Sequence, residues 1–226
     1  MTPDPRLQRN HSPLQLYYAS RASEYDRVYQ KPERQSDLRQ IEQWLPAVLA
    51  GATVLEVACG TGYWTKFIAP VASVVVALDS SPETLRIAQE RVVAPNTEFH
   101  IGDAYDLPQF GRPFSAAFAG FWFSHVPIER QREFLLGLNS TLEAGARVVM
   151  LDNLFVEGSS SAIAEKDAKG NTYQLRRLGD GSAHHVLKNF PTESHLHALA
   201  ESASGRSCVY RRWQYYWSFE YRVQEP

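Results

Sequence analysis

The sequence predicts a doubly wound α/β fold, in which helices cover both faces of a mostly parallel sheet. Residues 53–57 form a short, apolar, β-branched run of the kind found in strands that are buried on both faces. A tight turn with glycines at both ends, 60–62, follows this run and precedes a helical stretch. Residues 73–79 predict a second buried strand, and residues 82–92 predict the helix that follows it. This alternation is typical of parallel sheets with crossover helices.

The glycine turn and the end of the second strand together predict a cofactor site. Gly60 and Gly62 allow the backbone to approach a ligand closely, and the helix start after them offers unpaired N–H groups. Asp79 lies about 20 residues beyond the glycines, which is the spacing at which a carboxylate binds a ribose. Both features therefore indicate one cofactor that contains a nucleoside.

Neighbouring residues distinguish between cofactors. A turn that binds a dinucleotide needs a small residue three places after Gly62, and this chain has Thr65 there. Glu56, near the end of the first strand, would repel a diphosphate but suits a cationic ligand. A nicotinamide cofactor is therefore the less favoured interpretation.

Three short motifs occur in order along the chain: Glu56-x-Ala58-x-Gly60-x-Gly62, Asp79 and Gly102-Asp103-Ala104. On these motifs the chain resembles the class I S-adenosylmethionine-dependent methyltransferases over roughly residues 15–150. The resemblance implies a Rossmann-like, seven-stranded sheet that is mostly parallel with an antiparallel last strand. It also implies S-adenosyl-L-methionine as the cofactor and S-adenosyl-L-homocysteine as the product.

The resemblance and the strand ends together give a set of expected cofactor contacts. They are Tyr18, Tyr25, Glu56, Ala58, Gly60, Thr61, Gly62, Asp79, Ser80, Asp103, Ala104, Gly120 and Phe121. Ala58 stands where the commonest family pattern has its first glycine, and we expect it to be tolerated there with a negative φ. Asp103 is expected to accept a proton from the adenine amino group, and capping of the local turn is its alternative role.

An N-terminal helical cap is predicted, because apolar or aromatic residues recur at helical spacing over 14–29. Its Tyr18-x6-Tyr25-Asp26 pattern is similar to the segment that closes over the cofactor in many small-molecule methyltransferases. The aromatic faces near the sulfonium cation would come from Tyr17, Tyr18, Tyr25 and Tyr29, although each tyrosine could instead pack only on the core.

The remaining secondary structure follows from the same kinds of pattern. A helix begins near Pro32, and its apolar stripe ends before Pro46. Later elements are strands at 97–101, 114–120 and 146–152, helices at 129–142 and 192–202, and a final antiparallel strand pair within 208–223.

The predicted acceptor site lies after the fourth strand, because ligands of such sheets bind beyond the carboxyl ends of the strands. Phe121, Trp122 and Phe123 would form an apolar wall there. His125 is the side chain in this segment that can accept a proton near neutral pH, so it acts either as a catalytic base or in packing. Asp152, at the end of the next strand, is expected to hydrogen-bond the substrate or to serve in a turn.

An insertion over 153–191 is too long for a plain connection. Two extended runs around Gly179-Asp180-Gly181 predict a β-hairpin, which we interpret as a lid or substrate wall. The expected substrate residues are Tyr17, Trp122, Phe123, Asp152, Arg176, His184 and His185. No metal site is predicted, because the histidine pair lacks a third ligand.

Length and composition favour a single domain, since 226 residues with 44% hydrophobic content can bury one substantial core. The expected parts are a helical cap at 1–50, a cofactor-binding core at 51–152, the insertion at 153–191, and a C-terminal helix and strand pair at 192–226.

Charge and cysteine content limit the partners and the compartment. The net charge of −2 and the pI near 6.4 disfavour nucleic acid and anionic membranes, and they favour a small-molecule acceptor. Cys59 and Cys208 make no disulfide framework, and neither a secretory signal nor an apolar run of about 18 residues is present. We expect a cytoplasmic protein that is a monomer or a homodimer.

The implied reaction is an in-line displacement at an activated methyl group, so the protein contributes mainly by aligning the acceptor and excluding water. The aromatic residues around Trp122 favour an O or N nucleophile of a small aromatic or heteroaromatic metabolite. Two other classes stay open at this point. They are a noncatalytic regulatory protein that binds S-adenosylmethionine and, less favoured, a nicotinamide-dependent oxidoreductase.

Overall fold

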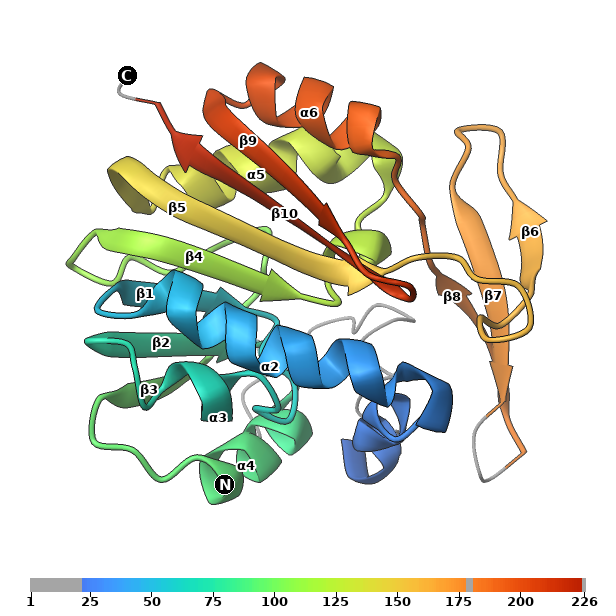
Figure 1. The fold of residues 1–226 in the computed structure, drawn as a ribbon, viewed down its shortest axis with the longest axis horizontal. Helices are drawn as coiled ribbons and strands as arrows, with labels where there is room; N and C mark the ends of the chain where they lie inside the picture. The colour runs from blue at the N-terminus through green and yellow to red at the C-terminus, as the bar shows by residue number, and fades with distance from the viewer. Residues whose placement is uncertain (1–21, 178–180, 225–226) are drawn as a thin grey trace, which may run out of the picture.

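A seven-stranded sheet between two layers of helices forms the centre of the molecule (Figure 1). The computed structural model describes residues 22–177 and 181–224. The order across the sheet is β3 (Thr97–Ile101), β2 (Val74–Asp79), β1 (Thr53–Val57), β4 (Phe114–Gly120), β5 (Leu142–Asn153), β10 (Tyr216–Val223) and β9 (Gly205–Arg212). Because β10 is antiparallel to both of its neighbours and the other pairs are parallel, the predicted sheet is confirmed.

The strand order reverses between β1 and β4. β1 pairs in parallel with β2 on one side and with β4 on the other, so Val57 near its carboxyl end lies opposite both Leu78 and Ala119. The carboxyl ends of β1 to β5 therefore meet at one edge of the sheet. In doubly wound sheets, ligands bind at this edge where the order reverses.

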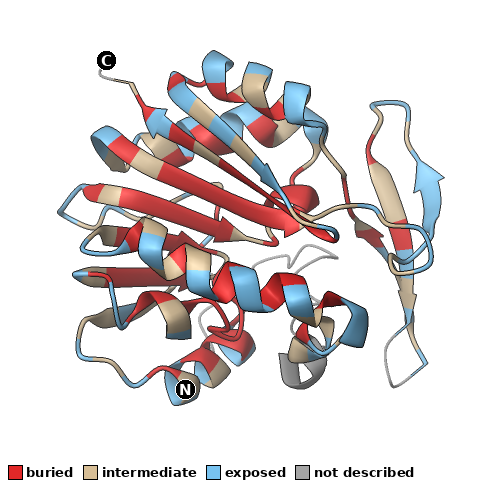
Figure 2. Ribbon diagram, in the orientation of Figure 1, coloured by how far each residue is buried: buried red, intermediate tan, exposed pale blue. Residues whose placement is uncertain are grey.

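Helices cover both faces of the sheet. The helices α2 (Gln35–Leu49), α3 (Thr65–Ile68) and α4 (Pro82–Arg91) pack on one face, and α5 (Gln131–Asn139) and α6 (Glu193–Ser202) pack on the other. Figure 2 shows that β1, β2 and β4 are buried over most of their length, and that β5 is buried toward its carboxyl end. These strands are apolar on both faces because each face is covered by helices.

Helix α2 runs through Pro46 to Leu49, so the prediction that its apolar stripe ends before Pro46 is wrong. Leu45 and Leu49 are both fully buried. Burying two leucines contributes roughly 3–6 kcal/mol, which is enough to offset the roughly 3 kcal/mol cost of proline inside a helix. Tertiary packing therefore overrides the local preference.

Short 3₁₀ helices lead into the longer helices. They are η2 (Ala22–Tyr29), η3 (Pro32–Arg34), η4 (Phe123–His125) and η5 (Ile128–Arg130). The helix predicted at 129–142 is shorter in the structure, because η5 precedes α5 and β5 begins at Leu142.

The insertion forms a separate three-stranded sheet in the order β6 (Ile163–Lys166), β7 (Thr172–Arg177) and β8 (Ala183–Leu187), which stands beside the large sheet in Figure 1. β7 and β8 pair in antiparallel fashion, as expected for a hairpin. β6 was not predicted, because its residues are all exposed and carry no alternating pattern of apolar and polar residues. The interpretation of this hairpin as a lid stays a prediction.

No helix in residues 22–177 and 181–224 combines the length and the apolar character that crossing a membrane requires.

Candidate functional site

The glycine turn after β1 is built by backbone conformations that favour glycine. Gly60 has a φ of 56° and Gly62 a φ of 72°. A Cβ atom on Gly62 would approach Ala88 Cβ to 3.0 Å, so the glycine also lets the turn pack on α4. The N–H group of Cys59 donates to Leu78 O at 3.0 Å, which ties the turn to β2.

Asp79 joins the two strand ends that the sequence singled out. Its Oδ2 atom accepts a hydrogen bond from Gly60 N at 2.8 Å, and its Oδ1 atom accepts from Ser81 N at 2.9 Å. Burial raises the pKa of Asp79, although these donors favour the ionised form. A carboxylate offers about four lone-pair positions, so Asp79 retains acceptor capacity for a ribose hydroxyl. Ser80 follows directly at the strand end.

Ala58 adopts a positive φ of 55°, so the expectation of a negative φ is wrong. Left-handed backbone costs a residue with a Cβ atom roughly 1–2 kcal/mol. The turn imposes this conformation because the residues on both sides are held, by β1 before it and by the Cys59 N–H bond to β2 after it.

We expect Ala58→Gly to raise the free energy of unfolding by about 1 kcal/mol, because glycine adopts the left-handed conformation without strain. Denaturant unfolding measures this change. Ala117→Gly is the matched control, since Ala117 is fully buried inside β4 and should lose stability on the same substitution. Equal destabilisation by both substitutions would contradict the assigned strain.

Glu56 is a buried carboxyl group on β1 that fits a cationic cofactor. The residue is only 1% exposed, and its Oε2 atom has no hydrogen-bond partner within the described part of the chain. Burial, assisted by the nearby charge of Asp79, raises the pKa of Glu56 to about 8. A positively charged ligand can pair with a buried carboxyl group that lacks a partner, whereas the negative charge of a diphosphate would repel it.

This pKa predicts proton release when a cationic cofactor binds. At pH 7 Glu56 is mostly protonated, and a nearby positive charge favours its carboxylate form, so binding expels a proton. Affinity for S-adenosylmethionine should therefore rise with pH up to about 8. Calorimetry in buffers of different ionisation enthalpy measures the release.

Two controls isolate the contribution of Glu56. Glu56→Gln should abolish its share of the proton release, and S-adenosylhomocysteine, which has no sulfonium charge, should release fewer protons than S-adenosylmethionine. Binding heats that are the same in every buffer for the unaltered protein would show that Glu56 does not sense the cofactor charge.

The N-terminal segment is fastened to the glycine turn through Thr61. The Thr61 hydroxyl donates to Asp26 Oδ1 at 2.7 Å and accepts from Arg91 Nη1 at 3.0 Å, while Arg91 also pairs with Asp26. Tyr29 is buried and stacks on Tyr63 with ring centroids 3.6 Å apart, so it packs on the core. The expected contacts Tyr17 and Tyr18 lie outside the described residues, as does the side chain of Tyr25.

Strained backbone follows β4. Phe121 has a φ of 58°, which is unusual for a bulky residue, and its N–H donates to Leu151 O at 2.7 Å. A Cβ atom on Gly120 would lie 2.9 Å from the Phe118 ring, so only glycine fits there. Such strain clusters at ligand sites, which agrees with the expected cofactor contacts at Gly120 and Phe121.

The residues after β3 have the geometry of a local turn. Asp103 is exposed, and its Oδ1 atom accepts from Tyr105 N at 2.9 Å. This bond is the one expected if Asp103 caps the local turn. It uses only Oδ1, so Oδ2 can still accept a hydrogen bond from an adenine amino group. Ala104 is buried against the core.

The predicted apolar wall is only partly present. Phe123 is fully buried and packs against Phe134 and Trp217, so it cannot contact an acceptor and that expectation is wrong. Trp122 is half-buried beside Tyr105, with ring centroids 6.0 Å apart. Trp122 is the N-cap of η4 and Phe123 is its first residue. Because a 3₁₀ helix has about three residues per turn, neighbouring side chains point in different directions, which the sequence alone does not reveal.

A buried ion pair lies at the carboxyl ends of β4 and β5. Lys188 Nζ donates to Asp152 Oδ1 at 2.8 Å and to Ser124 Oγ at 2.5 Å, and both charged side chains are at most 5% exposed. Asp152 Oδ2 also accepts from Ser124 N at 2.9 Å. Burial alone would raise the pKa of Asp152, but the Lys188 charge lowers it overall. Asp152 therefore holds Lys188 and Ser124 in place, and its direct contact with the substrate stays a prediction.

His125 is held by β8 through its ring. Its Nδ1 atom lies 2.6 Å from Leu187 O, so Nδ1–H donates and the tautomer leaves Nε2 as an acceptor. Burial, together with the charges of Lys188 and Arg176, holds the pKa of His125 well below its usual value. The imidazole is therefore neutral at pH 7 and is a weak base, and its catalytic role stays a prediction.

The predicted substrate residues of the hairpin lie on two different faces of the small sheet. His184 lies opposite Arg176 in the register, and both share a face with buried Gln174 and Val186. His185 points to the other face, where its side chain is 57% exposed beside Glu165. His185 is thus removed from the expected substrate contacts.

Two functional candidates, Lys188 and Arg34, were missed. Lys188 continues the inward positions of β8, so the alternation of 184, 186 and 188 was a usable signal. Arg34 is 5% exposed at the start of α2, and its Nη1 donates to Asn153 Oδ1 at 2.8 Å. No sequence periodicity marks it.

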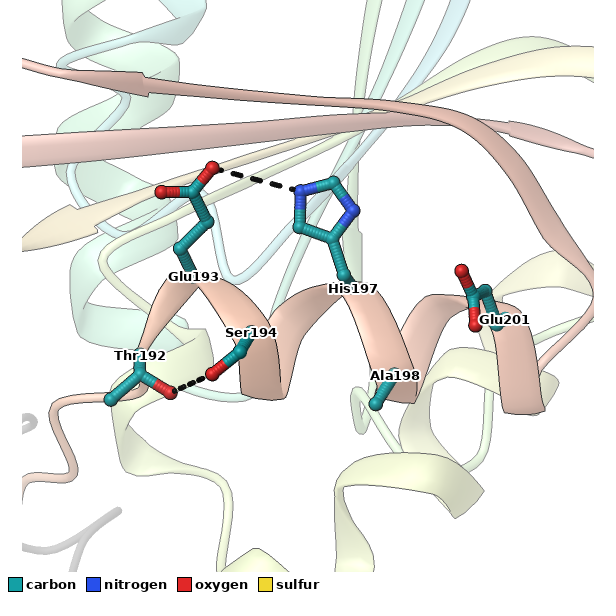
Figure 3. Close-up of a pocket in the computed structure, with 6 residues that line it drawn as sticks. All are labelled: Thr192, Glu193, Ser194, His197, Ala198 and Glu201. Atoms are coloured by element: carbon teal, nitrogen blue, oxygen red, sulfur yellow. Dashed lines mark hydrogen bonds and ion pairs between the residues drawn. The ribbon is translucent and has the colours of Figure 1, made fainter.

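Among the described residues, no group of three or more histidine, cysteine and acidic side chains could hold a metal ion. A shallow pocket on α6 is lined by Thr192, Glu193, Ser194, His197, Ala198 and Glu201 (Figure 3). Its side chains come from one helix and its cap, and the 3.9 Å Glu193–His197 pair is an ordinary surface contact.

The fold and the site define an α/β domain that binds a nucleoside cofactor where the strand order reverses. Residues 54–145 match the family model described as a methyltransferase domain. The chain is similar to an uncharacterised methyltransferase of Alkaliphilus oremlandii (strain OhILAs), with 26% identity over 68% of each chain. It is also similar to demethylmenaquinone methyltransferase of Lactiplantibacillus plantarum (strain ATCC BAA-793 / NCIMB 8826 / WCFS1), with 33% identity over 46% of each.

Solved structures extend the similarity to almost the whole chain. The DhpI–SAH complex is 27% identical with a TM-score of 0.79, over 95% of this chain and 97% of that one. The DhpI–SAM–HEP complex is 28% identical with a TM-score of 0.77, over 94% of this chain and 100% of that one. The chain spans only about half of the length of several curated relatives.

The chain is a class I S-adenosylmethionine-dependent methyltransferase, and its cofactor is S-adenosyl-L-methionine. The noncatalytic and the nicotinamide-dependent interpretations are therefore not retained.

Proposed function

We propose that this methyltransferase transfers the methyl group to an oxygen or nitrogen nucleophile of a small metabolite, at the carboxyl ends of β4 and β5. One observation carries the proposal. The glycine turn with Asp79 lies at the ends of β1 and β2, and a second buried polar group, Asp152 with Lys188, lies at the neighbouring ends of β4 and β5. The first of these polar sites fits the cofactor, and the second, beside it, fits the acceptor.

The residues of the first site would hold the cofactor. Asp79 accepts the ribose hydroxyls, Glu56 offers an unpaired carboxyl group to the positive charge, and Gly60 and Gly62 leave room for close approach. When bound, S-adenosylmethionine supplies an activated methyl group. Phe121 and Tyr29, which lie with ring centroids 5.7 Å apart, close this side against water.

The residues of the second site would orient the acceptor. His125 keeps Nε2 as a hydrogen-bond acceptor, so it can receive a proton from an acidic O–H or N–H, although its low pKa makes it a weak base. Alignment of the two reactants is therefore the larger contribution of the protein.

The aromatic character of the acceptor is the finer part of the proposal. Half-buried Trp122 supports a flat, aromatic or heteroaromatic metabolite. The similarity to a demethylmenaquinone methyltransferase supports a quinone-type ring as one member of that class.

Calorimetry and a methyl-transfer screen test the proposal. The protein should bind both S-adenosylmethionine and S-adenosylhomocysteine, and it should methylate members of a panel of phenols, heteroaromatic amines and hydroquinones. NADH, followed by its fluorescence, serves as the negative control. Failure to bind either sulfur nucleoside would overturn the assignment of the site, whereas binding without any turnover of ring compounds would remove only the aromatic acceptor.

A further inference from the structure

Two basic side chains of the N-terminal segment, Lys31 and Arg34, contact Ser159 in the insertion. Lys31 Nζ donates to the Ser159 carbonyl oxygen, and Arg34 Nε donates to Ser159 Oγ at 3.0 Å. Lys31 and Arg34 flank the start of the N-terminal helices, whereas Ser159 lies more than a hundred residues away in the sequence. The fold therefore brings Ser159 of the insertion against two cations that are neighbours in the N-terminal segment.

The same contacts continue into the acceptor site. Arg34 Nη1 donates to Asn153 Oδ1 at 2.8 Å, and Asn153 N donates to Asp152 Oδ1 at 2.8 Å. Asp152 in turn holds Lys188. Lys31, Arg34 and Lys188 thus belong to one continuous polar network at the carboxyl end of β5.

Arg176 completes this group of cations from the small sheet. It lies on the inward face of β7, where its Nε atom is buried, and its Nη2 donates to Gln174 Oε1 at 2.9 Å. Its positive charge acts on Lys31, on Lys188 and on His125, and it lowers the pKa of each. We call Lys31, Arg34, Arg176 and Lys188 the cationic cluster.

In residues 22–177 and 181–224, the acids near the cationic cluster pair with Lys188 or accept hydrogen bonds from other groups. Asp152 pairs with Lys188, Asp37 accepts from Tyr215 N at 2.8 Å, and Glu33 is exposed and accepts from Ser159 Oγ. Within the described residues, neither Lys31 nor Arg34 forms an ion pair with a carboxylate. Like charges held together and partly buried are unfavourable unless an anion joins them.

We propose that the cationic cluster binds an oxyanion of the methyl acceptor, namely a carboxylate or phosphate-type group. This inference rests on the proposed function, because it places the acceptor at the ends of β4 and β5. The planar fork of Arg34 has five N–H donors, of which Asn153, Ser159 and Tyr216 engage three, so donors remain for an oxyanion. The cluster gathers four cationic side chains in a chain whose net charge is −2.

An anchored oxyanion would orient the rest of the acceptor toward the methyl group. Charge-assisted hydrogen bonds fix direction as well as affinity, and the cluster draws its donors from the N-terminal segment, from β7 and from the segment after β8. The acceptor would then be enclosed by the same elements that recognise its charge.

Matched acceptor pairs test the inference. In the presence of S-adenosylmethionine, the protein is offered 4-hydroxybenzoate with 4-hydroxybenzamide, and glycerol 3-phosphate with glycerol. Turnover should be confined to the charged member of a pair, and the pair that responds distinguishes a planar from a tetrahedral oxyanion. Equal kcat/KM for the charged and the neutral members would overturn the inference.

Direct anion binding decides the question if no member of the panel is methylated. The protein saturated with S-adenosylhomocysteine is titrated with inorganic phosphate and with acetate in a calorimeter. At least one of the two should bind, and binding of neither would overturn the inference. Failure to bind S-adenosylhomocysteine itself would instead overturn the proposed function, so the two failures are distinguishable.

Single substitutions assign the binding to the cationic cluster. Arg176→Gln and Lys31→Gln should each weaken anion binding about 10-fold or more, because each removes a charge-assisted bond. Arg176→Lys should restore part of the affinity. Arg177→Gln is the matched control, since Arg177 is exposed next to Arg176 on the opposite face of β7, and it should change nothing. All variants should keep their affinity for S-adenosylhomocysteine, and unchanged anion binding in both cluster variants would contradict the assignment.

Discussion

We expect Lys188→Met to lower the free energy of unfolding by about 3–5 kcal/mol, because it leaves the carboxylate of Asp152 buried without its counter-charge. Asp152 is fully buried, and Lys188 is its only basic partner within hydrogen-bond distance among the described residues. Ser124 would lose its bond to Lys188 at the same time. Denaturant unfolding measures the change.

Two comparisons test whether the effect comes from an uncompensated charge. Lys169→Met removes an exposed pair with Glu129, so it should change stability little. The double variant Lys188→Met/Asp152→Leu should recover much of the lost stability, because it removes both charges together. A double variant as unstable as the single one would show that packing, and not charge, determines the cost.

The second large effect is expected at Asp79. Asp79→Ala should weaken binding of S-adenosylmethionine by about 2 kcal/mol or more, which is roughly 30-fold, since it leaves the ribose hydroxyls without their acceptor. It also removes the bonds from Gly60 N and Ser81 N, so of its bonds to β2 the glycine turn keeps the backbone bond from Cys59 N to Leu78 O.

Asp79→Asn separates cofactor binding from damage to the turn. Asparagine keeps the size and one acceptor oxygen, so the fold should persist while the cofactor affinity falls by a smaller factor. Calorimetry with S-adenosylhomocysteine and thermal unfolding of the same samples give both readouts. Undiminished affinity in both variants would refute the ribose assignment.

The cofactor half of the site was predictable because it is local in the sequence. A strand, a glycine turn and an acid after the next strand are fixed in spacing by the βαβ unit, and the structure joins Gly60 and Asp79 by a hydrogen bond. The positive φ of Ala58 was not predictable from the sequence, because alanine ordinarily favours a negative φ. The left-handed conformation is imposed by β1 on one side and by the hydrogen bond from Cys59 N to Leu78 O on the other.

The acceptor half depends on contacts between distant segments. Trp122, Phe123 and Asp152 were chosen because they follow strands, but the sequence does not say which of them face the core, and Phe123 and Asp152 prove to be fully buried. Likewise His184 and His185 are neighbours in sequence, yet the pleat turns them to opposite faces.

The sequence by itself therefore indicated the class of fold and, through the family resemblance, the nature of the cofactor, since both rest on patterns that span a few tens of residues. Only the tertiary structure brought Arg34 and Lys188 to the end of β5, with Arg176 close enough for its charge to act on Lys188. The physical reason is that charges from three separate segments share an environment only after the chain has closed around them, so their mutual repulsion is a property of the folded state.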